Sequence, residues 1–126
     1  MFSHVTIGTN DLTRATAFYD AVFAALGHGS FAIGGNYKGY GAADGDQVWI
    51  TLPVNGEPAT AGNGSMVAFL ADTRSSVDDA HGAAMANGGA DEGAPGLRPH
   101  YHENYYGGYF RDPDGNKICV VCHRPE

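Results

Sequence analysis

The sequence predicts an α+β domain built from two tandem βαβββ modules, because the chain contains an internal repeat. The His-Val-Thr-Ile run at residues 4–7 matches the Met-Val-Ala-Phe run at residues 66–69, and each resembles a short strand. Two Asp-Gly hairpin signals, at residues 44–45 and 114–115, also correspond. Two such modules are expected to form one curved, eight-stranded mixed sheet with a helix on the outside of each half.

A helix is predicted directly after the first strand of each module. Asp11 and Thr73 are suited to cap the two helices, because their side-chain oxygens can accept a hydrogen bond from an unpaired backbone N–H. Gly27 and Gly89 are predicted to end them, since glycine readily adopts the left-handed conformation of a helix C-terminus. Apolar residues recur in the first helix at three- and four-residue spacing, namely Ala15, Phe18, Tyr19, Val22, Phe23 and Leu26.

The remaining strands follow from the same correspondence. Residues 48–50 match residues 118–120, and both runs are β-branched or apolar, which is typical of a strand. The second strand of each module is placed at residues 29–33 and 90–97.

A single domain over residues 1–126 is expected, because a chain of this length supports one hydrophobic core. The stretch 56–64 contains three glycines and a proline and is predicted to link the modules. Module one then covers about residues 1–55 and module two about residues 65–126.

Composition and charge exclude several kinds of partner. The 7 basic against 14 acidic residues give a net charge of −7, which argues against nucleic-acid binding. No apolar run approaches the roughly 18 residues of a membrane span. The sequence shows no secretory signal and no disulfide pattern, so a cytoplasmic location is expected.

The two cysteines form a Cys-x-x-Cys spacing that can indicate metal or redox chemistry. Cys119 and Cys122 lie in a predicted strand, however, where residues three apart point to opposite faces. They are therefore predicted to be separate thiols that behave as small hydrophobic residues.

Two motifs resemble the vicinal oxygen chelate superfamily, which includes glyoxalase I, fosfomycin and bleomycin resistance proteins, and extradiol dioxygenases. The first motif is Ala-Phe-Tyr-Asp at residues 17–20, in the helix after the first strand, and the second is Tyr-Phe-Arg-Asp-Pro-Asp-Gly-Asn-Lys-Ile at residues 109–118. The resemblance covers nearly the whole chain. It implies a homodimer and a small-molecule ligand on the concave face of the sheet.

Strand alternation assigns residues to the two faces of the sheet. The consistently apolar set is predicted to face the helices: Val5, Ile7, Val48, Ile50, Leu52, Val67, Phe69, Ile118, Val120 and Cys122. The mixed set of opposite parity is predicted to line the concave face: His4, Thr6, Trp49, Thr51, Met66, Ala68, Cys119, Val121 and His123. Trp49, Thr51, Met66, Cys119 and Val121 of this set are candidate ligand-binding residues.

In metal-using members of the resembled superfamily, four repeat-related strands each supply one ligand. The corresponding positions are His4, Trp49 (or Thr51 after a two-residue slip), Met66 and Cys119. Only His4 has a side chain that the superfamily commonly uses, since tryptophan does not coordinate and methionine is a soft ligand. We therefore predict that no metal site is present, with a divalent metal at His4 as the alternative.

Residues 98–106 form the most chemically dense stretch, and they are predicted to rim the concave pocket. Aromatic rings and a guanidinium here can stack on a ligand or hold an anionic group, which makes Arg98, Tyr101 and Tyr106 candidate ligand-binding residues. His102 and Tyr105, together with His4, are candidate catalytic residues. Two alternatives remain: chelation of a metal by His100 and His102 with Glu103 or His123, and a loop that only caps the core.

Two functions are compatible with these residues. The first is a glyoxalase-like enzyme, a lyase, isomerase or dioxygenase of unassigned substrate, with His4 as acid, base or metal ligand. The alternative is a metal-free binding protein for a drug or metabolite, in which Trp49, Met66, Val121 and the tyrosines form an apolar, aromatic cup.

Overall fold

The structure is a computed structural model that describes residues 1–126 as two helices and eight strands. Neither helix combines the length and the apolar character that a membrane span requires. The first module contains β1 (His4–Gly8), α1 (Leu12–Ala25), β2 (Ser30–Ile33), β3 (Tyr37–Gly41) and β4 (Gln47–Thr51). The second contains β5 (Val67–Leu70), α2 (Arg74–Ala86), β6 (Ala90–Leu97), β7 (Tyr106–Arg111) and β8 (Lys117–Cys122). The predicted α+β fold of two tandem βαβββ modules is confirmed.

The helices begin at the predicted caps and end at glycines. The side chains of Asp11 and Thr73 each accept a hydrogen bond of 3.0 Å from the backbone N–H three residues later. Gly27 follows α1 with a φ of 83°, as predicted. After α2 the left-handed residue is Gly88, with a φ of 92°, and not Gly89. Gly89 instead lies so close to Phe18 that a Cβ there would come within 2.9 Å of the ring.

The eight strands are hydrogen-bonded as two four-stranded sheets with the same internal order. The orders are β1-β4-β3-β2 and β5-β8-β7-β6, and in each sheet the first two strands are parallel and the others antiparallel. Thr6 pairs with Trp49 in one sheet, and Ala68 pairs with Cys119 in the other. These equivalent registers show that the modules are structural repeats. The edge strands β1 and β5 do not pair with each other.

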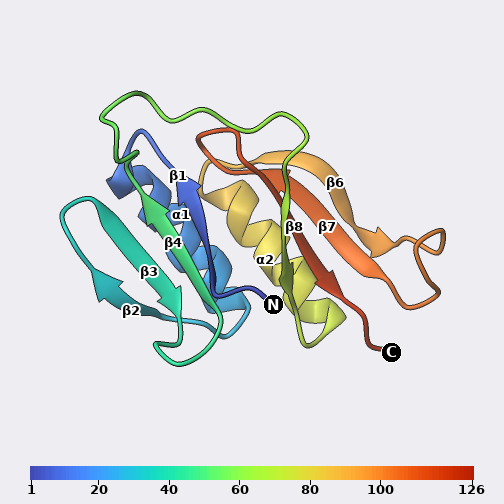
Figure 1. Cartoon of the computed structure of the whole chain (residues 1–126). Coiled ribbons are helices and arrows are strands. Elements are labelled where there is room, and N and C mark those ends of the chain that lie inside the picture. The colour runs from blue at the N-terminus through green and yellow to red at the C-terminus, as the bar shows by residue number, and fades with distance from the viewer.

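Both helices lie behind the sheets in Figure 1, and the chain between β4 and β5 crosses the top of the molecule. The face turned towards the viewer is the one that the helices leave uncovered. We call it the concave face, and it corresponds to the face that strand alternation predicts for a ligand.

The two modules share one hydrophobic core. Phe18 of α1 contacts Phe110 of β7, with ring centroids 5.8 Å apart, and Phe23 of α1 contacts Phe69 of β5 at 5.0 Å. Phe18 and Phe110 are completely buried. Because an α1 side chain completes the packing of module two, neither module buries its apolar surface alone.

The Asp-Pro-Asp-Gly hairpin between β7 and β8 is anchored to module one by two carboxylates. Asp112 accepts a hydrogen bond of 2.6 Å from the Tyr19 hydroxyl, which is buried in α1. Asp114 accepts one of 2.9 Å from the Asn10 N–H and forms an ion pair of 2.8 Å with Arg14. This motif therefore holds the modules together as well as turning the chain.

Candidate functional site

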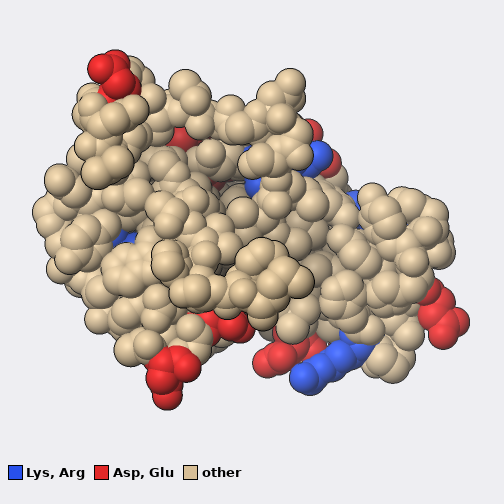
Figure 2. All heavy atoms as spheres, viewed as in Figure 1, with Lys and Arg blue, Asp and Glu red and all other residues tan.

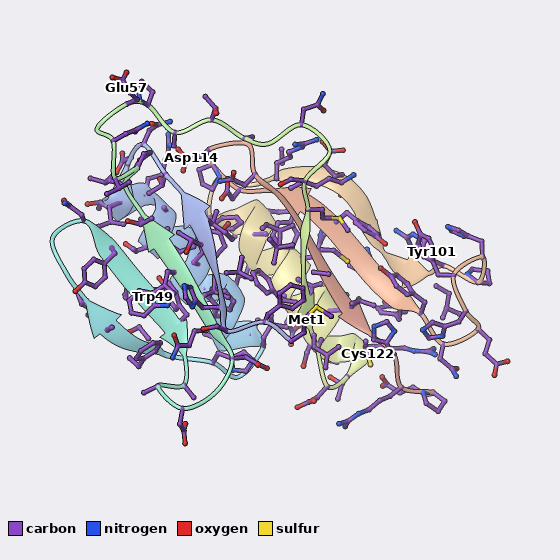
Figure 3. The ribbon with its side chains drawn as sticks, in the orientation of Figure 1. Met1, Trp49, Glu57, Tyr101, Asp114 and Cys122 are labelled. Atoms are coloured by element: carbon purple, nitrogen blue, oxygen red, sulfur yellow. The ribbon has the colours of Figure 1, made fainter.

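Aromatic side chains gather on the concave face in two separate groups, one on each sheet. In Figure 3, Trp49 lies on the sheet of module one, whereas Tyr101 lies far from it on the loop between β6 and β7. Charged residues lie mainly around the rim of this face, and most of its centre is formed by other residues (Figure 2). The face therefore offers apolar and neutral polar groups to a ligand.

The module-one aromatic cluster consists of Phe31, Tyr37 and Trp49. The Trp49 ring lies against Gly39, where a Cβ would come within 2.9 Å of it. Its ring centroid is 5.3 Å from that of Phe31 and 5.6 Å from that of Tyr37, both with edge-to-face geometry. The indole N–H donates to the Gln47 side-chain oxygen at 3.1 Å. Trp49 is therefore held in a fixed orientation, with its polar atom already satisfied.

The module-two aromatic cluster consists of Tyr101, His102, Tyr105, Tyr109 and His123. The Tyr105 hydroxyl lies 2.8 Å from the Tyr109 hydroxyl, and its ring is 4.8 Å from the Tyr101 ring and 5.4 Å from the His123 ring. His102 Nε2 lies 2.8 Å from His123 Nδ1, and these two rings are stacked. The cluster is thus a connected network of phenols and imidazoles.

Cys119 lies beneath this network, and its Sγ is 3.6 Å from the Tyr105 hydroxyl. Burial is the main cause that raises the pKa of Tyr105, Tyr109 and the Cys119 thiol. All three groups therefore keep their protons at neutral pH. The phenols can donate a hydrogen bond to a ligand, whereas the thiol is completely buried, and all three groups are poorly suited to act as a base or a nucleophile.

The raised pKa values predict that the protein is sensitive to alkali. Five of the seven tyrosines have a raised pKa, namely Tyr19, Tyr40, Tyr105, Tyr106 and Tyr109. Burial is the main cause in four of them. In Tyr106 the main cause is the hydrogen bond to Asp78. An acid whose pKa is higher in the folded than in the unfolded state stabilises the fold below the unfolded-state pKa. This contribution is lost as the pH rises past about 8.5 for cysteine and about 10 for tyrosine.

We expect the free energy of unfolding to fall steadily above about pH 9. The near-ultraviolet absorbance of ionised tyrosine should rise at the same pH at which the circular dichroism of the folded protein is lost, because these hydroxyls ionise mainly on unfolding. Gradual ionisation of all tyrosines at their ordinary pKa, with the fold intact, would contradict this expectation.

The other predicted site residues lie in different environments. Thr51 donates its hydroxyl to the backbone, and Val121 is almost fully buried opposite Gly107 on β7. Arg98 donates to the Ala94 carbonyl at 2.8 Å and lies over the Tyr109 ring at 5.5 Å, which places it at the edge of the module-two aromatic cluster.

Tyr106 is not brought to the concave face. Its hydroxyl donates to Asp78 of α2 at 2.6 Å, and its ring packs against the core. Tyr105 and Tyr106 are adjacent, so an extended backbone turns them to opposite faces. His123 and Tyr109 are cluster members that were not singled out as binding residues, although Tyr109 pairs directly with Cys119.

Comparison with known proteins identifies the family. The model of the glyoxalase/bleomycin resistance protein/dioxygenase superfamily matches residues 1–120. The chain belongs to this superfamily. No match is found among curated protein sequences.

Several solved structures share the superfamily fold over nearly the whole chain. A glyoxalase/bleomycin resistance protein from Albidiferax ferrireducens T118 is 44% identical, with 99% of both chains covered and a TM-score of 0.88. A superfamily enzyme from Burkholderia phytofirmans PsJN is 22% identical, covers 97% and 98% of the two chains and has a TM-score of 0.72. A lactoylglutathione lyase from Agrobacterium tumefaciens is 23% identical, covers 97% and 92%, and has a TM-score of 0.65. The last two likenesses concern the fold alone.

The residues of this superfamily member do not fit a metal centre at the four repeat-related positions. His4 is exposed at the start of β1 and its Nδ1 lies 2.8 Å from the Ser3 hydroxyl. Trp49 and Met66 offer no suitable ligand atom, and the Cys119 thiol is completely buried beneath the Tyr105 hydroxyl. No group of three or more His, Cys, Asp or Glu side chains is arranged to hold a metal ion.

Proposed function

We propose that this superfamily member binds a small, uncharged aromatic molecule on its concave face without a metal ion. The observation that carries this proposal is the module-two aromatic cluster, in which rings and protonated hydroxyls form one connected surface. Its edge-to-face and tilted rings provide sites for stacking a planar ligand. One of the Tyr105 and Tyr109 hydroxyls donates to the other, which leaves this pair one O–H group that can donate to a ligand.

The chemistry of these groups restricts the ligand. Donors that keep their protons favour an acceptor on the ligand, such as a carbonyl oxygen. The Arg98 guanidinium donates to the Ala94 carbonyl and lies over the Tyr109 ring at the edge of the cluster, whereas the central Tyr105 and Tyr109 hydroxyls are uncharged and favour a neutral ligand. A neutral aromatic ketone, lactone or quinone combines the required features.

A homodimer is part of the proposal. The two aromatic clusters lie on different sheets, and neither lines any of the four main cavities of one chain. A second copy could cover an exposed cluster with the opposite sheet and so enclose a ligand. We also propose a cytoplasmic location for the protein, with which its two free, buried cysteines are compatible.

Coumarin binding, measured by isothermal titration calorimetry, tests the proposal with a matched pair of variants. Tyr105→Phe should weaken binding about tenfold, because it removes one hydrogen-bond donor that faces the ligand. Tyr106→Phe removes the hydroxyl of the adjacent residue, which faces α2, and should leave the affinity within about twofold of the original. Equal losses in both variants, or no saturable binding of coumarin by the unchanged protein, would refute the proposal.

Catalysis by the same cluster is a second candidate, favoured by the contact of 2.8 Å between His102 and His123 beside Tyr105. Such an imidazole pair can accept and pass on a proton, as an isomerase or lyase requires. If the cluster is catalytic, His102→Gln should abolish conversion of the bound ligand, whereas coumarin should still bind. Mass spectrometry that finds every ligand unchanged after prolonged incubation with the protein would eliminate this candidate.

A further inference from the structure

A cavity of about 300 Å³ lies between the two modules, apart from both aromatic clusters. It opens between the edge strands β1 and β5, which do not pair with each other, and it reaches the C-terminal half of α1. Its volume is at the lower end of the range for small-molecule sites. Since nine of its fifteen lining residues are hydrophobic, transfer of an apolar group into it is favourable.

The walls of this cavity present methyl groups and ring edges. Val5, Val48 and Val67 line it from three different strands. Phe23 also lines it, but its ring is enclosed by Tyr40 at 4.8 Å and Phe69 at 5.0 Å. The Phe2 ring also lines the cavity and is exposed, whereas the walls formed by Val5, Val48 and Val67 are aliphatic and suit an aliphatic group.

Polar groups are confined to the mouth. His4 and His28 lie there, and both are exposed. His4 Nδ1 contacts the Ser3 hydroxyl, which leaves its Nε2 available, and the His28 ring has no hydrogen-bond partner within the chain. One or two imidazole nitrogens can therefore bind a hydroxyl or carbonyl group on the ligand.

The charge around the mouth disfavours anions. No Lys or Arg lines the cavity, and the carboxylate of Asp46 does. An anionic ligand would lose its hydration beside this carboxylate without gaining a lysine or arginine partner.

We propose that this inter-module cavity is a second binding site, which takes a neutral alicyclic or branched aliphatic molecule that carries one hydroxyl or carbonyl group. The apolar part occupies the space among the valines and Phe23. The polar group stays at the mouth with His4 and His28. The site is independent of the module-two aromatic cluster.

Saturation-transfer NMR with cyclohexanol tests this proposal, because this ring has no π face and does not stack on the concave-face tyrosines. Cyclohexanol should receive saturation from the protein. Cyclohexanecarboxylate, which has the same ring and a negative charge, should receive at least about fivefold less. Absence of a cyclohexanol signal, or equal signals from both compounds, would overturn the proposal.

Matched variants locate the site. Leu70→Trp places a large side chain at the mouth and should weaken cyclohexanol binding at least about fivefold. Ile33→Trp changes another exposed strand residue, away from the cavity, and should have no effect. If Leu70→Trp fails to fold, Ala68→Leu narrows the same mouth from an exposed position and should weaken binding in the same direction.

The two proposed sites are separated by one more variant. Tyr105→Phe, which should weaken coumarin binding, should leave the cyclohexanol signal unchanged. Retained cyclohexanol binding in the variant that blocks the mouth, or its loss in Tyr105→Phe, would show that cyclohexanol does not occupy the inter-module cavity.

Discussion

Asp112→Ala is expected to lower the free energy of unfolding by about 3 to 4 kcal/mol, because it leaves one buried and three partly buried donors without their acceptor. The Asp112 carboxylate accepts from the Tyr19 hydroxyl, from the Asp114 and Asn116 backbone N–H groups and from the Asn116 amide. Tyr19 is completely buried, so bulk solvent does not reach its hydroxyl to replace the lost partner.

Urea unfolding followed by circular dichroism measures this effect. Asp44→Ala is the matched control, since Asp44 occupies the exposed β3–β4 turn and makes no side-chain hydrogen bond. It should change the free energy of unfolding by less than about 0.5 kcal/mol. A loss below about 1 kcal/mol for Asp112→Ala would mean that the hairpin does not hold the modules together.

Phe110→Ala is expected to destabilise the fold by about 3 to 5 kcal/mol. Phe110 is completely buried, and it contacts Phe18 of the other module and the His81 ring, so its removal leaves a cavity at the shared core. Phe31→Ala removes the same ring from the partly exposed concave face and should cost less than about 1.5 kcal/mol.

The same measurement tests whether the modules unfold together. Trp49 fluorescence reports on module one alone, because it is the only tryptophan, whereas circular dichroism reports on both modules. The two signals should give one midpoint in the original protein and one lower midpoint in Phe110→Ala. Separate midpoints would contradict the shared core.

The repeat made most of the fold predictable from the sequence. The caps Asp11 and Thr73 and the corresponding Asp-Gly turns repeat a local pattern that does not depend on distant contacts. Gly88 and Gly89 are an exception, because either glycine can take a left-handed conformation and the choice depends on the close approach of Phe18 to Gly89.

The candidate site was less predictable, because it depends on register and on how the sheets are placed. Strand alternation predicts that Trp49 and Cys119 both lie on the concave face, but it does not predict that they belong to separate clusters. The sequence predicts that Tyr106 faces a ligand together with Tyr105, because both are tyrosines in the chemically dense segment 98–106. The pairing of Tyr106 with Cys122 in the β7–β8 register turns it towards α2 instead.

The central claim is that ligand binding on the concave face needs no metal ion, and coumarin titration of chelator-treated protein tests it most directly. We expect the affinity for coumarin after chelation to stay within about twofold of that measured with added Zn²⁺, Ni²⁺, Mn²⁺ or Fe²⁺, since no trio of suitable ligands is present. Dialysed protein should retain far less than one metal ion per chain. Retention of one ion per chain, together with loss of coumarin binding on chelation, would contradict the account.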